Sequence, residues 1–293
     1  MFVIFGASGN TGRILALALL AQGKRVRAVG RRRDKLAALE AAGAEPFVAD
    51  LENSAAVTEA LRGAQAAYLM IPPNMTVDDV RAYQARVVES VGRAVEGSQL
   101  THAVLLSSVG ADHASGTGPI AALHDFEARL NLVSALNLLI LRAGSFMTNL
   151  LGNLELMKSR GMNALPAPGT VSVGFVHPSD VGSYAAHRLG RLDFTGKSVV
   201  NVIGPKFLTL EEATVTLGRA VARTFEYLQV PSQAAESSLQ QAGLKPQMAR
   251  MFVEMYEGAA KGLLRPQQGT SVVHTTTSIE FFAVTEFATA FRA

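Results

Sequence analysis

The chain contains no cysteine, which excludes disulfide bonds, thiolate nucleophiles and zinc sites with cysteine ligands. It also lacks any apolar run near the roughly 18–20 residues that span a bilayer. No basic stripe alternates with aromatic residues, so nucleic-acid binding has little support. No basic segment precedes the first apolar residues, which argues against a secretory signal. We therefore expect a soluble, cytoplasmic protein without membrane or nucleic-acid partners.

Charge is sparse as well. Only 17% of the 293 residues are charged, and 27 basic against 24 acidic residues give a net charge of +3. Hydrophobic residues make up 48% of the chain, which is enough for a substantial core and is not the composition of a disordered protein. The length suits one α/β domain with an appended part.

A glycine motif follows the first apolar segment. Residues 1–5 are continuously apolar, which predicts a strand buried on both faces. Gly6, Gly9 and Gly12 then have the spacing G-x-x-G-x-x-G, and a run of strong helix formers follows from residue 13. A strand, a glycine turn and a helix in this order predict a dinucleotide site. The turn residues expected to contact the cofactor are Gly6, Ser8, Gly9, Asn10, Thr11 and Gly12.

Strands and helices are expected to alternate through the first two thirds of the chain. The expected strands are 1–5, 25–29, 46–49, 66–71, 102–106, 136–141, 171–175 and 198–202. Helices are expected in between, and this alternation predicts parallel strands joined by crossover helices. The predicted fold class is α/β, a doubly wound parallel Rossmann sheet with a smaller, mainly helical C-terminal substrate part.

Arginines follow the second expected strand, at the point that separates the two nicotinamide cofactors. An acid there would accept hydrogen bonds from a ribose 2′-hydroxyl, whereas Arg31 and Arg32 favour a 2′-phosphate. We therefore expect NADP(H) in preference to NAD(H). An exposed loop that opens the next helix is the other interpretation. Further contacts to the cofactor are expected from residues at the ends of later strands: Asp50, Ile71, Pro72 and Ser107.

The remaining residues from 205 onward are expected to be mostly helical. Two structural parts are predicted: residues 1–150 with 170–204 bind the cofactor, and residues 151–169 with 205–293 shape a substrate pocket. The chain crosses between the parts more than once.

The sequence resembles the NmrA-like group of atypical short-chain dehydrogenases/reductases, which includes NAD(P)H:quinone reductases and NADP(H)-sensing regulators. The resemblance covers nearly the whole chain. It rests on the glycine turn, the arginines after the second strand and the segments Ser107–Gly110, Leu141–Leu150, Val176–Gly182 and Ile203–Pro205. In this family the turn after Arg142 lies near the nicotinamide, and Phe146 there is expected to contact the cofactor or to belong to the core.

The resemblance also shows what this chain lacks. Most short-chain dehydrogenases carry a Tyr-x-x-x-Lys pair on the helix after the fifth strand, and the tyrosine exchanges a proton with the substrate. Here Ile120 and His124 stand in those two positions, while Ser108 matches the serine that polarises the substrate oxygen. Isoleucine cannot carry a proton, so carbonyl reduction by the usual mechanism is disfavoured.

Ser108 and His124 are therefore the candidate catalytic residues. His124 either acts near the nicotinamide ribose and donates a proton, or packs on its helix face with Glu127 one turn further on. His113 lies in a Gly/Ser-rich loop, 112–118, which is expected to be a mobile surface loop rather than the carrier of a catalytic base. No metal site is expected.

Two main functions are compatible with these residues. The first is an NADPH-dependent reductase of quinones or similar small electrophiles by direct hydride transfer. The second is a non-catalytic NADP(H)-binding sensor with a protein partner. A reductase or isomerase that recruits another acid, such as His113 or His124, is a third alternative.

Overall fold

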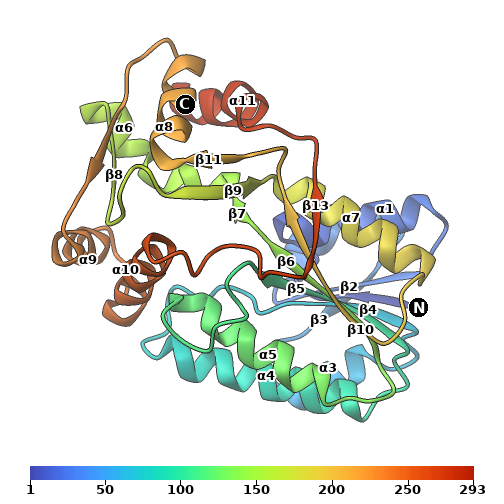
Figure 1. Cartoon of the computed structure of the whole chain (residues 1–293). Helices are drawn as coiled ribbons and strands as arrows, with labels where there is room; N and C mark the ends of the chain where they lie inside the picture. The colour runs from blue at the N-terminus through green and yellow to red at the C-terminus, as the bar shows by residue number, and fades with distance from the viewer.

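An eight-stranded sheet forms the centre of the structure, a computed structural model that describes residues 1–293 (Figure 1). The strand order is β13-β10-β6-β5-β4-β1-β2-β3, and every neighbouring pair is parallel. The strands are β1 (Phe2–Ile4), β2 (Val26–Gly30), β3 (Glu45–Val48), β4 (Ala66–Leu69), β5 (His102–Ser108), β6 (Asn137–Ala143), β10 (Lys197–Ile203) and β13 (Ser271–His274). This sheet confirms the predicted α/β fold.

Helices cover both faces of the sheet (Figure 1). Alternate residues of β1 point to opposite faces, so Ile4 packs in one apolar core and Val3 in another. The first core includes residues of α1 (Asn10–Ala21), α2 (Ala37–Ala41) and α7 (Pro178–Arg191). The second core includes residues of α3 (Ser54–Ala60), α4 (Val80–Glu96) and α5 (Ala121–Asn131). The 3-10 turns η1 (Arg33–Leu36) and η2 (Gly118–Ile120) precede α2 and α5.

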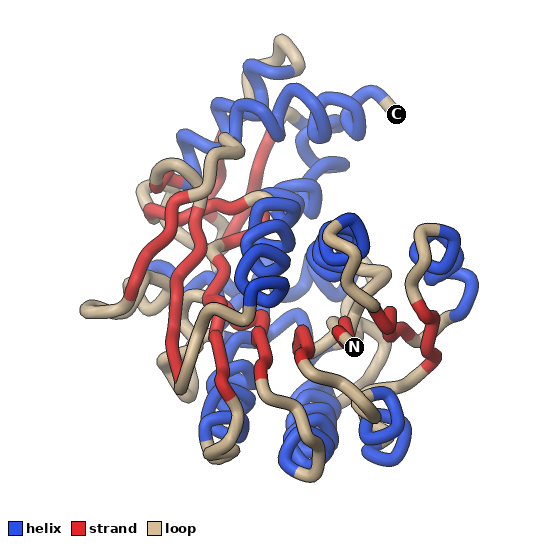
Figure 2. Tube along the Cα trace, turned by 90° about the vertical axis from the view of Figure 1, so that its right-hand side faces the viewer, coloured by secondary structure: helices blue, strands red, loops and turns tan.

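A smaller part lies beyond one edge of the main sheet, with a third apolar core of its own. Its strands are β7 (Ser145–Phe146), β8 (Met162–Leu165), β9 (Ser172–Val176), β11 (Phe207–Thr209) and β12 (Glu226–Gln229). They form a three-stranded sheet, β11-β9-β7, and a two-stranded one, β12-β8. The tube in Figure 2 shows these short strands and the helices around them.

The helices of this part occupy most of the remaining residues. They are η3 (Met147–Asn153), α6 (Leu154–Arg160), α8 (Leu210–Ala220), α9 (Ser232–Gln241), α10 (Pro246–Ala260), α11 (Ile279–Phe282) and α12 (Ala288–Arg292), with a π-helical turn, Ala283–Phe287, between the last two. Thr209 and Glu212 form a capping box at the start of α8, because each side chain accepts a hydrogen bond from the other residue's backbone N–H. No helix in the structure is both long and apolar enough to cross a bilayer.

Five strands differ from the sequence expectations: β7, β8, β11, β12 and β13. The strand at 198–202 was expected to be the last of the main sheet, but β13 pairs beyond it, with Val200 opposite Ser271 and Ile203 opposite His274. β7, β8, β11 and β12 were not predicted either. All five are two to four residues long, and none has the continuous buried apolar run that marks the central strands.

Candidate functional site

The carboxyl ends of the parallel strands share one edge of the main sheet. Strand order reverses between β1 and β4, because the chain passes from β1 outward to β2 and β3 and then returns to β4. In open α/β sheets, ligands bind outside the carboxyl ends at such a reversal. The glycine turn follows β1 directly and therefore lies at this position.

The glycine turn is closely packed. Gly6 has a φ of +62°, a backbone conformation that is strained for a residue with a side chain. The Gly6 carbonyl accepts a hydrogen bond from the Gly9 N–H at 2.9 Å. A Cβ on Gly12 would lie 2.4 Å from the Gly6 oxygen. Gly12 therefore allows α1 to pack directly against the turn. On Gly9 a Cβ would lie 3.2 Å from the same oxygen.

The start of α1 is open to solvent. Ser8, Gly9 and Asn10 are exposed, and no side chain caps the N-terminus of the helix. The free N–H groups at a helix start attract anions, phosphates in particular. Thr11 was expected to contact the cofactor. Its side chain is buried, and its hydroxyl accepts a hydrogen bond of 2.9 Å from the Tyr68 hydroxyl on β4. Its side chain thus helps to hold α1 on the sheet.

The two arginines after β2 have different surroundings. Arg32 forms an ion pair of 2.5 Å with Asp34, and this hydrogen bond holds the pKa of Asp34 below its usual value. Arg31 is exposed and makes no hydrogen bond or ion pair within the chain. Burial raises the pKa of Tyr83 to about 12, and the charge of nearby Arg31 opposes that rise. Arg31 is therefore the guanidinium available to an external anion.

The other expected strand-end residues also reach this edge. Asp50 is exposed, and one of its carboxylate oxygens accepts a hydrogen bond from the Glu52 N–H at 3.1 Å. Ile71 and Pro72 are half-buried, and the Pro72 carbonyl accepts a hydrogen bond of 3.0 Å from the Tyr83 hydroxyl. This contact ties the loop after β4 to α4.

The paired serines at the end of β5 point to different environments. Ser108 is half-buried, and its hydroxyl donates to the neighbouring Val109 carbonyl at 3.0 Å. Ser107 is buried and donates to Glu127 on α5 at 2.5 Å. Ser107 was expected to contact the cofactor, but its hydroxyl belongs to a polar network behind the sheet edge.

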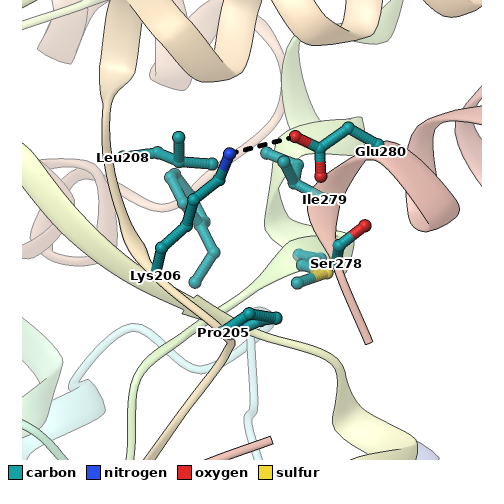
Figure 3. Close-up of a pocket in the computed structure, with 8 residues that line it drawn as sticks. Pro205, Lys206, Leu208, Ser278, Ile279 and Glu280 are labelled. Atoms are coloured by element: carbon teal, nitrogen blue, oxygen red, sulfur yellow. Dashed lines mark hydrogen bonds and ion pairs between the residues drawn. The ribbon is translucent and has the colours of Figure 1, made fainter. Parts of the chain in front are cut away.

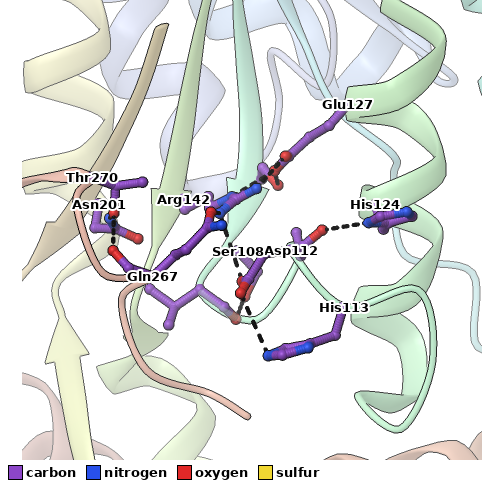
Figure 4. A network of polar contacts seen from close by, with 12 residues as sticks. Ser108, Asp112, His113, His124, Glu127, Arg142, Asn201, Gln267 and Thr270 are labelled. Atoms are coloured by element: carbon purple, nitrogen blue, oxygen red, sulfur yellow. Dashed lines mark hydrogen bonds and ion pairs between the residues drawn. The ribbon is translucent and has the colours of Figure 1, made fainter.

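That network centres on a buried ion pair that sequence reasoning missed (Figure 4). Arg142 on β6 and Glu127 on α5 are 5% and 6% exposed and bond through two nitrogen–oxygen contacts of 3.0 and 2.7 Å. Burial opposes the charge of Arg142, but Glu127 and Asp112 outweigh it and raise the pKa of the guanidinium. Gln267 accepts a further hydrogen bond from Arg142 at 3.1 Å. The pair thus fastens the segment before β13 to the sheet.

His124 lies in the first turn of α5, and Ile120 is the last residue of the η2 turn just before it. His124 is half-buried, and its Nδ1 lies 3.0 Å from the Ala111 carbonyl, so Nδ1 carries a proton and Nε2 is left free. Ile120 is only 8% exposed. Glu127 bonds Ser107 and Arg142 rather than His124. His124 therefore anchors the loop after β5.

The Gly/Ser-rich loop was expected to be a mobile surface loop. Ala114 and Ser115 are exposed, but the residues on either side of them are partly or fully covered. Helix α10 covers part of it, because a Cβ on Gly118 would lie 2.0 Å from the Met251 oxygen and one on Gly258 2.2 Å from the Gly116 oxygen. The Gly116 N–H also donates to Glu254 at 2.9 Å. Thr117 is fully buried. The loop is thus held between the sheet edge and the smaller part.

Beyond β6, Phe146 and Met147 lead into the smaller part. Phe146 is half-buried and packs against the first core, while Met147 is buried in the third. Met147 also lines a small hollow beside Phe175 and Leu208, and the Lys206 ammonium reaches across it to Glu280 at 3.3 Å (Figure 3). Met147 is therefore mainly a core residue. No three His, Asp or Glu side chains gather in a way that could hold a metal ion.

Comparisons with known proteins agree with this architecture. A reductase of Streptomyces griseus that acts on a (4-alkanoyl-5-oxo-2,5-dihydrofuran-3-yl)methyl phosphate is 26% identical over 89% of this chain and 88% of that protein. The NADPH complex of an NADPH-dependent quinone oxidoreductase from Escherichia coli has a TM-score of 0.83 at 23% identity, covering 97% of this chain and 98% of that one. The NADP(H) complex of a Citrobacter triphenylmethane reductase has a TM-score of 0.83 at 18% identity, covering 98% of this chain and 100% of that one.

These structural similarities establish the fold. The family is established by sequence, because the sequence model of the NmrA-like family matches residues 1–286. The chain belongs to the NmrA-like family.

Proposed function

We propose that this chain is an NADPH-dependent reductase of quinones or similar small electrophiles that works by direct hydride transfer. The observation that carries the proposal is the exposed, uncapped start of α1 behind the glycine turn, at the reversal of strand order. The named activities of the three relatives, all reductases, support the same reaction class.

The residues present fit a dinucleotide. Gly9 is exposed at the start of α1, and a side chain there would project beside the Gly6 oxygen into the space where a pyrophosphate binds. Ser8, Asn10 and the backbone of Thr11 would hold the phosphates, and Arg31 would hold the 2′-phosphate of NADP(H). Asp50, Ile71 and Pro72 would border the adenosine half, and Phe146 the nicotinamide. When bound, this cofactor supplies a hydride.

The choice of acceptor follows from the missing tyrosine. Ile120 is buried and has no proton to exchange, so acceptors that need strong acid assistance are disfavoured. A quinone needs less assistance, because its reduction forms an aromatic hydroquinone. Ser108 would hydrogen-bond the acceptor oxygen, and His124 would hold the adjoining loop through Ala111.

We also propose that the two parts of the chain have separate roles. Residues 1–150 with 170–204 would bind the cofactor, and residues 151–169 with 205–293 would shape the acceptor pocket. The border is shared, because β13 belongs to the second group of residues by sequence and to the main sheet by pairing.

A second candidate is a non-catalytic NADP(H) sensor with a protein partner. Ile120 favours it, because the position that carries the acid in most short-chain dehydrogenases is apolar and buried here. A sensor would bind NADPH without oxidising it in the presence of any acceptor.

Steady-state oxidation of NADPH with a panel of quinones tests the reductase. We expect turnover by the wild-type chain, slower turnover with NADH, and none with Gly9→Val. Quinone-dependent oxidation that is absent, or equal in the wild type and Gly9→Val, would contradict it. Tight NADPH binding without any oxidation would favour the sensor.

A further inference from the structure

Two consecutive residues just after β5, Ala111 and Asp112, are held by contacts with three different parts of the structure. The Ala111 N–H donates to the Ser108 carbonyl at 3.0 Å, which turns the chain back beside Ser108. The Ala111 carbonyl is held by His124 of α5 at 3.0 Å. The next residue, Asp112, lies 3.6 Å from the buried Arg142 guanidinium. The turn that follows Ser108 is therefore tied to both α5 and β6.

The residue after Asp112, His113, is presented outward from this turn (Figure 4). The backbone N–H of His113 donates to the Gly110 carbonyl at 3.2 Å. Nε2 of the His113 ring lies 3.4 Å from Oδ2 of Asp112. The imidazole side chain is 40% exposed, and Nδ1 has no partner in the chain. Asp112 itself is only 15% exposed, and its inner oxygen accepts no hydrogen bond. A carboxylate held by a buried cation thus faces an imidazole with one free nitrogen.

We propose that His113 is the proton donor of this site, oriented by Asp112, in place of the tyrosine that Ile120 replaces. This inference rests on the proposed reductase function. His124 also has a free nitrogen, Nε2, but its Nδ1 partner is the Ala111 backbone carbonyl, so no carboxylate orients it as Asp112 orients His113. Asp112 and His124 are positioning residues, since each acts through the loop that carries His113.

The reaction balances with this donor. The acceptor gains two electrons and a hydrogen nucleus as the hydride that NADPH loses, and NADP+ remains. The Nδ1–H bond of the His113 imidazolium breaks as an O–H bond forms on the acceptor oxygen. The neutral imidazole then recovers a proton from water through its exposed side. The Nε2 proton stays on the imidazole ring throughout and faces Asp112.

Two acceptors separate proton donation from hydride transfer. A quinone needs both a hydride and a proton, whereas a cationic triphenylmethane dye is reduced by a hydride alone. We expect His113→Gln to lower kcat for the quinone by about 10²-fold. We expect the same variant to reduce the dye at the wild-type rate. His187→Gln is the matched control, because His187 is exposed on α7, and it should change neither rate.

The pH dependence gives a second readout. The charged or titratable groups that contact this loop are Asp112, Arg142, His124, Glu254 and Arg81, and His113 lies closest to Asp112. Wild-type kcat for the quinone should fall as the pH rises, because only the protonated imidazole can donate a proton. His113→Gln should remove that fall, and Asp112→Asn should displace it while leaving dye reduction intact.

A third readout does not depend on turnover. Diethylpyrocarbonate modification of His113, measured by peptide mass spectrometry, should slow when NADP+ and a quinone are both bound. Modification of His187 should not change. This protection places the imidazole at the acceptor.

Several results would overturn the inference. Equal loss of quinone and dye reduction in His113→Gln would assign His113 a structural role. An unchanged quinone rate and pH profile would remove it from the reaction. A wild-type chain that binds NADPH but reduces neither acceptor would refute the reductase function and the proton donor together, whereas quinone turnover that survives in His113→Gln refutes the donor alone.

Discussion

Arg31 and Arg32 are neighbours in the chain, but their guanidinium groups are not equivalent. Arg32 shares its charge with Asp34, and Arg31 has no partner. The sequence could place both arginines after a strand, at the position that selects the cofactor. The sequence could not show which of the two guanidinium groups is unpaired, because that depends on which arginine reaches Asp34 in the folded chain.

We expect Arg31→Ala to weaken NADPH binding by about 10- to 100-fold and NADH binding very little, because only NADPH carries the 2′-phosphate. Arg32→Ala should have a smaller effect. Arg33→Ala is the control, since Arg33 pairs with Glu40 at 2.6 Å. Fluorescence titration with both cofactors measures the difference. An equal loss for NADPH and NADH would remove Arg31 from cofactor selection.

For the buried Glu127–Arg142 pair, the sequence predicts that Arg142 is buried but does not identify its acidic partner. Arg142 lies within an apolar strand, a signal that predicts burial and hence a buried acidic partner. Which acid fills that role is decided by the packing of α5 on the sheet. The contact between Ser107 and Glu127 depends on the same packing, because the two residues are 20 positions apart in the chain.

Arg142→Met should destabilise the fold by about 3–5 kcal/mol, because it leaves Glu127 buried without a cation. A second substitution, Glu127→Leu, should recover part of that loss. Arg93→Met should cost far less, since Arg93 pairs with Glu89 on the exposed face of α4. Urea unfolding measures all three. A loss for Arg142→Met no larger than that for Arg93→Met would contradict a stabilising role for the pair.

At the scale of elements, the central strands were predictable and the peripheral ones were not. β1, β4, β5 and β6 are buried apolar runs between turn residues, so composition alone marks them. β13 pairs with β10, about 70 positions earlier in the chain, and only one of its four residues is not exposed. Its place in the sheet comes from the long-range path of the chain, which periodicity does not encode.

Helix α10 depends on glycines at its contact with the loop after β5. Gly118 has a φ of +59°, and a Cβ there would also lie 2.0 Å from the Met251 oxygen. Gly262 is the matched control, because it has a φ of +81° and open space around its Cβ position. The two positions therefore separate backbone strain from steric conflict.

Gly262→Ala should cost about 1 kcal/mol from backbone strain alone, whereas Gly118→Ala should cost about 3 kcal/mol or more, because α10 must also move. Hydrogen exchange of residues 246–260 should accelerate only in Gly118→Ala. Unchanged exchange in that variant would show that α10 is held by other contacts.

For the whole molecule, the fold and the family follow from the sequence, but the acceptor does not. The order of glycine turn, arginines and later segments is enough to place the chain in the NmrA-like family. The segments that we propose to shape the acceptor pocket come from several parts of the chain, so their packing could not be predicted from spacing. The loop at 112–118 is an example, since the helix that covers it begins more than a hundred residues later.

We propose that NADPH binds at the edge of the main sheet beside Gly6, Gly9 and Gly12. Calorimetric titration of the full chain with NADPH tests it most directly, with Gly9→Val as the comparison and thermal unfolding without ligand as a check on the fold. We predict one NADPH per wild-type chain and binding at least about 100-fold weaker in Gly9→Val, because the added side chain blocks the phosphates. Equal NADPH binding by the two proteins, or none by the wild type, would contradict the account.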